Sequence, residues 1–174
     1  MMLKSRPDGY GSVAVTIHWL TAILIVAALG SGFQADRMVD SATQAAFLRF
    51  HIPVAITVLL LTVFRIVWWW RFDRKPIPVK GPPPWQERFA RFVHFAFYVV
   101  MLGMVASGIG MMVLSGAGPI IFGGSGALPD FHDYPPRVPH GIGAFLLVIL
   151  LFAHVGAALY HHFFRWDGLI RRMW

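Results

Sequence analysis

Histidines are the residues of this chain whose type and spacing could do chemistry. The 174-residue sequence contains eight of them, and several interrupt long apolar runs. An ionisable side chain inside hydrocarbon is costly, so we expect it to have a function and a partner. His140 and His154, in RVPHGIGAFLLVILLFAHVGAALYHH, are fourteen residues apart. That spacing is close to four helical turns, so one helix would present both imidazoles on one face, about 21 Å apart along its axis.

Two other histidines match these two in depth. With a rise of 1.5 Å per residue, His18 would lie about 9 Å and His154 about 14 Å from the same membrane face. His51 and His140 would lie roughly 3 to 8 Å from the opposite face. Each pair can therefore meet at its own level of a helical bundle.

A pair of neutral imidazoles from facing helices is what a six-coordinate haem iron needs, because the porphyrin supplies four nitrogens. A structural zinc ion takes four ligands, and only two histidines gather at each level. The chain has no cysteine, which excludes disulfides, thiolate metal sites and covalent c-type haem attachment. Noncovalent haem fits best, while a channel or transporter with proton-relaying histidines remains an alternative.

Further residues are second-rank candidates. Arg49 and Arg65 could each pair with a haem propionate, or simply extend toward the membrane surface. His94 could contact the edge of the inner haem, replace an assigned ligand, bind a quinone, or have an interfacial structural role. His132 is expected to be a loop residue without a role, with proton handling or a surface metal site as the alternatives. His161 and His162 are expected to be solvated residues at a helix end.

The elements that must position these histidines are transmembrane helices. Hydrophobic residues make up 57% of the chain and charged residues 13%, with a mean hydropathy of +0.62, which is typical of a membrane protein. Four segments are long and apolar enough to span: about 12–33, 46–70, 92–114 and 138–163. We expect one all-α domain over residues 1–174, a four-helix bundle with two haems in its interior, and a first helix that is retained rather than cleaved.

The basic residues indicate orientation rather than nucleic-acid binding, although the formal net charge is +7. They lie between apolar runs instead of forming one solvated face. Four spans place both termini and the 71–91 loop on one side, where most of the basic residues lie, so both termini should be cytoplasmic. That side holds Lys4, Arg6, Arg71, Arg74, Lys75, Lys80, Arg88, Arg91, Arg165, Arg171 and Arg172, and the other holds Arg37, Arg49 and Arg137.

Two connections have distinct compositions. The proline-rich stretch 73–85 is expected to run extended along the cytoplasmic face. The Gly/Pro-rich stretch 115–136 is expected to lie against the outer interface, over whatever the helices hold there.

The chain resembles the bacterial cytochrome b561 family, small four-helix dihaem membrane proteins related to the cytochrome b subunits of nickel-iron hydrogenases. The resemblance runs from about residue 10 to residue 172. It is carried by IHWL at 17–20, His51 with Arg65 further along its helix, HFAFYVVMLGMVASGIGMMV at 94–113, the His140 to His154 spacing, and HHFF at 161–164. Pro53 departs from the family pattern and would remove a backbone donor just below the outer site.

The resemblance implies two noncovalent haem b groups in the bacterial inner membrane. His18 with His154 would hold the cytoplasmic-side haem, and His51 with His140 the periplasmic-side one. With both irons six-coordinate, chemistry would be outer-sphere electron transfer at the haem edges.

The activity that the resemblance implies is that of a superoxide:quinone oxidoreductase, which takes electrons from superoxide at the periplasmic side and reduces ubiquinone. Arg37, Arg49 and Arg137 would attract the anion, offset by nearby aspartates. The alternative is a dihaem membrane-anchor subunit that relays electrons between a dehydrogenase or hydrogenase partner and quinone. The expected partners are membrane lipid and quinone. Whether the chain also forms a homodimer or binds a redox partner subunit is left open by the resemblance.

Overall fold

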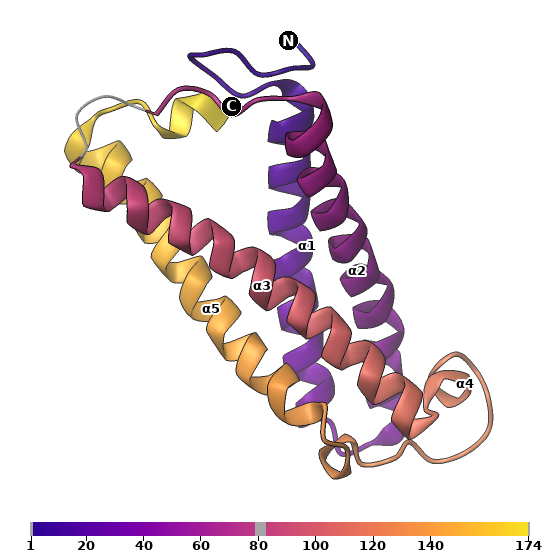
Figure 1. The fold of residues 1–174 in the computed structure, drawn as a ribbon. Helices are drawn as coiled ribbons and strands as arrows, with labels where there is room; N and C mark the ends of the chain where they lie inside the picture. Colours follow the sequence, from indigo (N-terminus) through magenta and orange to yellow (C-terminus); the bar gives the residue numbers. More distant parts are fainter. Residues whose placement is uncertain (1, 79–82, 174) are drawn as a thin grey trace.

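Four long helices dominate the structure, a computed structural model that describes residues 2–78 and 83–173 (Figure 1). They are α1 (Ser12–Arg37), α2 (Ser41–Val67), α3 (Pro84–Ser115) and α5 (Arg137–Tyr160). All four are long and apolar enough to cross a membrane. The described residues form no strand, apart from an isolated bridge between Arg6 and Gly9. The predicted fold class, an all-α membrane protein with four spanning helices, is confirmed.

Shorter elements complete the chain at both ends of the bundle. α2 and α5 each continue into a five-residue π-helical turn, Trp68–Phe72 and His161–Arg165. The 115–136 connection contains the short helix α4 (Gly118–Ile121) and a 3-10 turn (Phe131–Asp133). Ile121 of α4 is fully buried, so part of this connection packs onto the bundle.

The helices extend beyond the apolar segments expected from the sequence. α1 continues to Arg37 rather than ending near 33. α2 begins at Ser41 rather than near 46, because the carboxylate of Asp40 accepts hydrogen bonds from the amide (2.8 Å) and hydroxyl (2.6 Å) of Thr43. Such a cap satisfies backbone donors that the helix itself leaves free. Hydropathy marks only the part inside hydrocarbon, whereas capped helices run on into the interface.

α3 also begins earlier than the apolar pattern indicates. It begins at Pro84 rather than near 92, because proline is tolerated in the first helical turn, where its missing N–H would have no partner. The linker expected over 73–85 is therefore shorter than predicted. Its residues 79–82, Lys80 among them, lie outside the described part of the chain.

The long helices form two antiparallel pairs. α1 packs mainly against α2, and α3 mainly against α5, with fewer contacts between the pairs. In Figure 1 the pairs diverge toward the end at which both chain termini lie. We call this the terminal end, and the opposite one, which carries α4, the α4 end.

The core of the bundle takes one residue from each long helix. Ile25, Val58, Met101 and Leu147 form a buried apolar cluster, which we call the central tier. Many other large apolar side chains point outward and are exposed, as expected for helices that contact lipid.

At the terminal end, segments far apart in sequence are tied together. The carboxylate of Asp73 accepts hydrogen bonds from the amide (3.1 Å) and hydroxyl (2.8 Å) of Ser5 and from the indole of Trp68 (3.2 Å). The guanidinium of Arg172 donates to the carbonyls of Pro7 and Asp8, both at 2.9 Å. The N-terminal segment is therefore held to the end of α2 and to the C-terminal segment.

Candidate functional site

Each long helix presents three residues to the bundle interior at intervals of seven. Seven residues are about two helical turns, or about 10 Å of rise, and drift by only about 20° around the axis. The middle residue of each set belongs to the central tier. The sets are His18, Ile25 and Gly32 on α1, His51, Val58 and Arg65 on α2, His94, Met101 and Gly108 on α3, and His140, Leu147 and His154 on α5.

His51 and His140 face each other on the α4 side of the central tier. Their ring centroids are 6.2 Å apart and their ring planes are inclined by 72°. His51 comes from α2 and His140 from α5, so the pair spans the two helix pairs. We call it the α4-end pair.

Backbone carbonyls orient both imidazoles of the α4-end pair. Nδ1 of His51 lies 2.9 Å from the carbonyl oxygen of Ala28, and Nδ1 of His140 lies 3.0 Å from that of Met104. A carbonyl can only accept a hydrogen bond, so Nδ1 carries the proton in each ring. Nε2 of each neutral imidazole is then left with a free lone pair, which is the state a metal ligand requires.

A Ser-Gly dipeptide lies beside each ring of the α4-end pair. The hydroxyl oxygens of Ser31 and Ser107 are 3.4 Å and 3.1 Å from the Nδ1 atoms of the two rings. A Cβ atom added at Gly32 would come within 3.0 Å of the His51 ring, and one at Gly108 within 3.4 Å of the His140 ring. Gly32 therefore lets the His51 ring lie close to the backbone of α1, whereas a Cβ at Gly108 would be at ordinary van der Waals distance from the His140 ring.

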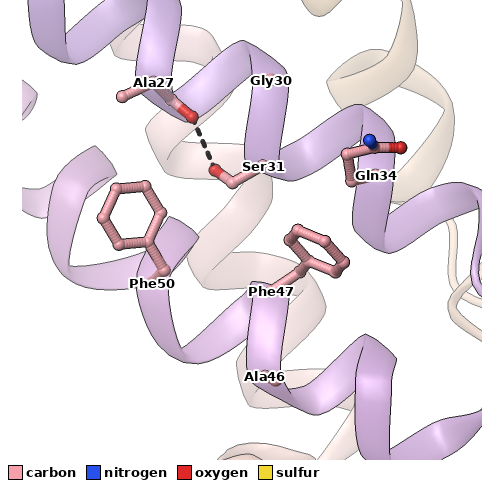
Figure 2. A pocket seen from close by; sticks show the side chains of 7 residues that line it. All are labelled: Ala27, Gly30, Ser31, Gln34, Ala46, Phe47 and Phe50. Carbon is pink, nitrogen blue, oxygen red and sulfur yellow. Dashed lines mark hydrogen bonds between the residues drawn. The ribbon is translucent and has the colours of Figure 1, made fainter.

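The serine of α1 is itself fixed by its own helix. Figure 2 shows the hydroxyl of Ser31 donating to the carbonyl of Ala27 at 2.8 Å. Its oxygen is thus kept near Nδ1 of His51. A pocket of about 410 Å³ lies next to it between α1 and α2, lined by Ala27, Gly30, Ser31, Gln34, Ala46, Phe47 and Phe50.

A larger cavity of about 560 Å³ contains the α4-end pair. It is bounded on one side by residues of the central tier and on the other by the rim at the α4 end. At the rim, Arg137 donates to the carboxylate of Asp36 at 2.5 Å, and His132 lies 3.0 Å from Asp130 and 3.8 Å from Asp36. The cavity is within the 300–1,000 Å³ range typical of ligand pockets.

His18 and His154 face each other on the other side of the central tier. Their ring centroids are 6.1 Å apart, with an interplanar angle of 60°. We call them the terminal-end pair. His94 lies closer to His154, at 5.4 Å, but it comes from α3, the helix packed against α5. The Phe97 ring also contacts His154, at 5.6 Å.

A half-buried cation, Arg65, lies beside the terminal-end pair. Nη1 of Arg65 is 3.4 Å from Nδ1 of His18. In the described part of the chain no carboxylate forms an ion pair with Arg65, and its Nε is buried without a hydrogen-bond partner. A half-buried guanidinium whose Nε has no partner is costly, so an anionic group that the protein does not supply would stabilise this site.

These observations fit a haem group at each pair. Two imidazoles that coordinate one ion from opposite sides, with metal–nitrogen bonds of about 2 Å, have centroids roughly 6 Å apart. Both pairs show that separation. Haem also carries carboxylates, the kind of group that Arg65 lacks. Among the described residues, no cluster of three or more His, Cys, Asp or Glu could hold a metal ion by itself.

Several predicted residues lie away from the two pairs. Arg49 is exposed and only two positions from His51, so its side chain leaves α2 about 200° around the helix from the His51 ring. His132, expected to be a loop residue, lies in the 3-10 turn of the 115–136 connection, at the rim of the larger cavity. His161 is not solvated as expected: it is half-buried and contacts Asp167 at 2.5 Å. The ring of His162 lies against Phe163.

Ser31, Gly32, Ser107 and Gly108 are site residues that sequence reasoning missed. The recurrence of Ser-Gly on two helices was a signal, but the same dipeptide also occurs at 115–116 and 125–126. The seven-residue interval that leads from each histidine to the central tier was the more specific signal.

Comparison with known proteins agrees with this architecture. The family model of prokaryotic cytochrome b561 matches residues 9–174. Cytochrome b561 homolog 1 of Escherichia coli is 27% identical, over 94% of this chain and 96% of the relative. Cytochrome b562 of Cereibacter sphaeroides is also 27% identical, over 97% of each chain.

Because the family model matches almost the whole chain and four helices are long and apolar enough to span a membrane, the function that defines the family applies to this chain. The protein is a multi-pass membrane cytochrome that holds haem b and transfers electrons. The chain belongs to the prokaryotic cytochrome b561 family.

Proposed function

We propose that the chain oxidises superoxide at its α4 end and passes the electrons through two haem b groups to ubiquinone. His51 and His140 would ligate one haem, and His18 and His154 the other. The observation that carries the proposal is the presence of two imidazole pairs, with centroids 6.2 Å and 6.1 Å apart, on opposite sides of the central tier.

The chemistry that bound haem supplies is one-electron transfer between ferric and ferrous iron. The chain's own residues would hold each haem group in place. The carbonyls of Ala28 and Met104 keep the proton on Nδ1, so that Nε2 of His51 and His140 faces the cavity as a ligand. Arg65 is the residue available to pair with a propionate at the terminal-end pair. The buried apolar side chains of the central tier lie between the two pairs.

The reaction balances over two turnovers. Two superoxide anions each lose one electron and leave as oxygen, and one ubiquinone takes up both electrons with two protons to form ubiquinol. Because two imidazoles of the chain would complete the ligation of each haem iron, neither substrate would need to bind the metal. Charge would steer superoxide to the α4 end. Since Arg137 is bound to Asp36, we assign this steering to the exposed Arg37 and Arg49.

Purified protein in proteoliposomes tests the proposal. We expect about two haems per chain, and ubiquinone reduction driven by superoxide that superoxide dismutase abolishes. The dihaem-anchor alternative would be favoured by another result. In that case the purified protein would bind two haems and fail to oxidise superoxide by itself, but would co-purify with a dehydrogenase subunit that reduces its haems. Protein without b-type haem bands in reduced-minus-oxidised spectra would refute the whole electron-transfer proposal.

A further inference from the structure

The two histidine pairs lie in different electrostatic surroundings. At the terminal-end pair, Nη1 of Arg65 lies 3.4 Å from His18, and its Nε is buried without a partner. In residues 2–78 and 83–173, no carboxylate is paired with this guanidinium. Beside the terminal-end pair the protein therefore places one positive charge that it does not offset with a carboxylate of its own.

The α4-end pair has no such excess of positive charge. The cation that lines its cavity, Arg137, is bound to Asp36 at 2.5 Å, and Asp130 lies at the same rim. In addition, both imidazoles donate from Nδ1 to backbone carbonyls, at 2.9 Å and 3.0 Å. Such hydrogen bonds make a histidine ligand more basic.

The charge difference acts on redox potential, and the ligand hydrogen bonds of the α4-end pair act in the same direction. A nearby cation stabilises the state with one more electron, and it does so strongly where little water screens it. A more basic ligand instead stabilises the oxidised metal, because it donates more electron density to it. The terminal-end site should therefore hold an electron more tightly than the α4-end site.

We infer that Arg65 gives the terminal-end haem the higher midpoint potential, so that electrons run from the α4 end to the terminal end. The inference rests on the proposed function, because it requires a haem at each pair. With a haem at each pair, one electron would pass from the α4-end site, which would be oxidised, to the terminal-end site, which would be reduced, and no proton would move in that step.

Redox titration of the purified protein, followed by the haem absorption bands, tests this. The wild-type chain should titrate as two components. His154→Ala should remove the component of higher potential, and His140→Ala the one of lower potential. These two variants test the order of the potentials without altering Arg65.

Arg65 is then tested in a His51→Ala background, which leaves the terminal-end pair. Arg65→Gln should weaken the preference for the reduced state at least tenfold, equivalent to a fall of about 59 mV for a one-electron couple. Arg65→Lys should restore most of it. The control is Arg91→Gln, which also removes one positive charge at the terminal end, but from a side chain that is 69% exposed. Because solvent screens that charge, the midpoint potential should not change.

Loss of the lower-potential component in His154→Ala, or an unchanged potential in Arg65→Gln, would overturn the inference. A wild-type chain that binds a single haem would instead show that the proposed function fails. Haem content, measured on the same samples, separates the two failures.

Discussion

At the residue scale, the choice of iron ligands depends on which imidazole faces His154. The ring centroid of His18 lies 6.1 Å from that of His154, and His18 comes from the other helix pair, as His51 does relative to His140. The ring centroid of His94 lies 5.4 Å from that of His154, but His94 comes from α3, the helix packed against α5. Ligands from the two helix pairs would hold a haem between them, which favours His18 as the partner of His154. His94 would then lie beside the haem without ligating it.

This assignment predicts the haem content of three alanine variants. His18→Ala and His154→Ala should each lose one haem, so that about one remains per chain, because a single imidazole cannot complete six-coordination. His94→Ala should retain both. Pyridine haemochrome assay on purified protein measures the content, and the opposite result for His18 and His94 would reassign the ligand.

The close approach of Gly32 to His51 gives a second test at this scale. A Cβ at Gly32 would come within 3.0 Å of the His51 ring, whereas nothing lies within 4 Å of one at Gly30. Gly32→Val should displace the imidazole and reduce haem content toward one per chain, while Gly30→Val, the matched control on the same helix, should leave it unchanged. Equal haem content in the two variants would contradict the role assigned to this glycine.

At the scale of elements, the depth of each histidine could be predicted from sequence, because helical rise is constant. The meeting of His51 with His140 agrees with depth alone, whereas depth does not distinguish His18 from His94 as the partner of His154. The carbonyl clamps of Ala28 and Met104 could not be predicted, since every residue has a carbonyl and only packing decides which one faces an imidazole. The early start of α3 was missed because it depends on a proline in the first turn, outside the apolar run.

Asp73 links two elements and makes the stability of the terminal end depend on pH. Burial by itself raises the pKa of this carboxyl, but the hydrogen bonds from Ser5, Arg74 and Trp68 outweigh it, so the pKa lies below its ordinary value of 3.8. A depressed folded-state pKa adds stability above the unfolded pKa, and this stability is lost as the pH falls through the folded-state pKa.

Asp73→Asn should therefore destabilise the protein at pH 7, by about 1–2 kcal/mol, and progressively less as the pH falls below about 4. Thermal unfolding in detergent across this pH range measures the difference from wild type. Asp8→Asn is the control, because its side chain is exposed in the same N-terminal segment and should change little at any pH. A constant difference between Asp73→Asn and wild type at all pH values would refute the prediction.

At the scale of the whole molecule, α5 is the element shared by both histidine pairs. It supplies His140 to one and His154 to the other, with Leu147 of the central tier between them. Because the partners His51 and His18 come from α2 and α1, the two pairs join α5 to both helices of the other antiparallel pair. Two haems would thus hold together helix pairs that make few contacts of their own.

The direction of electron flow across the membrane depends on which end faces the cytoplasm. Both termini lie at the same end (Figure 1), together with most of the basic residues, so we expect the terminal end to be cytoplasmic.

The chain contains no cysteine, so a single introduced thiol reports its own side. Ser125→Cys lies in the connection at the α4 end, and Lys75→Cys follows α2 at the terminal end. In spheroplasts a membrane-impermeant maleimide should label Ser125→Cys directly and Lys75→Cys only after permeabilisation. The reverse pattern would place the α4-end pair on the cytoplasmic side, where periplasmic superoxide could not reach it.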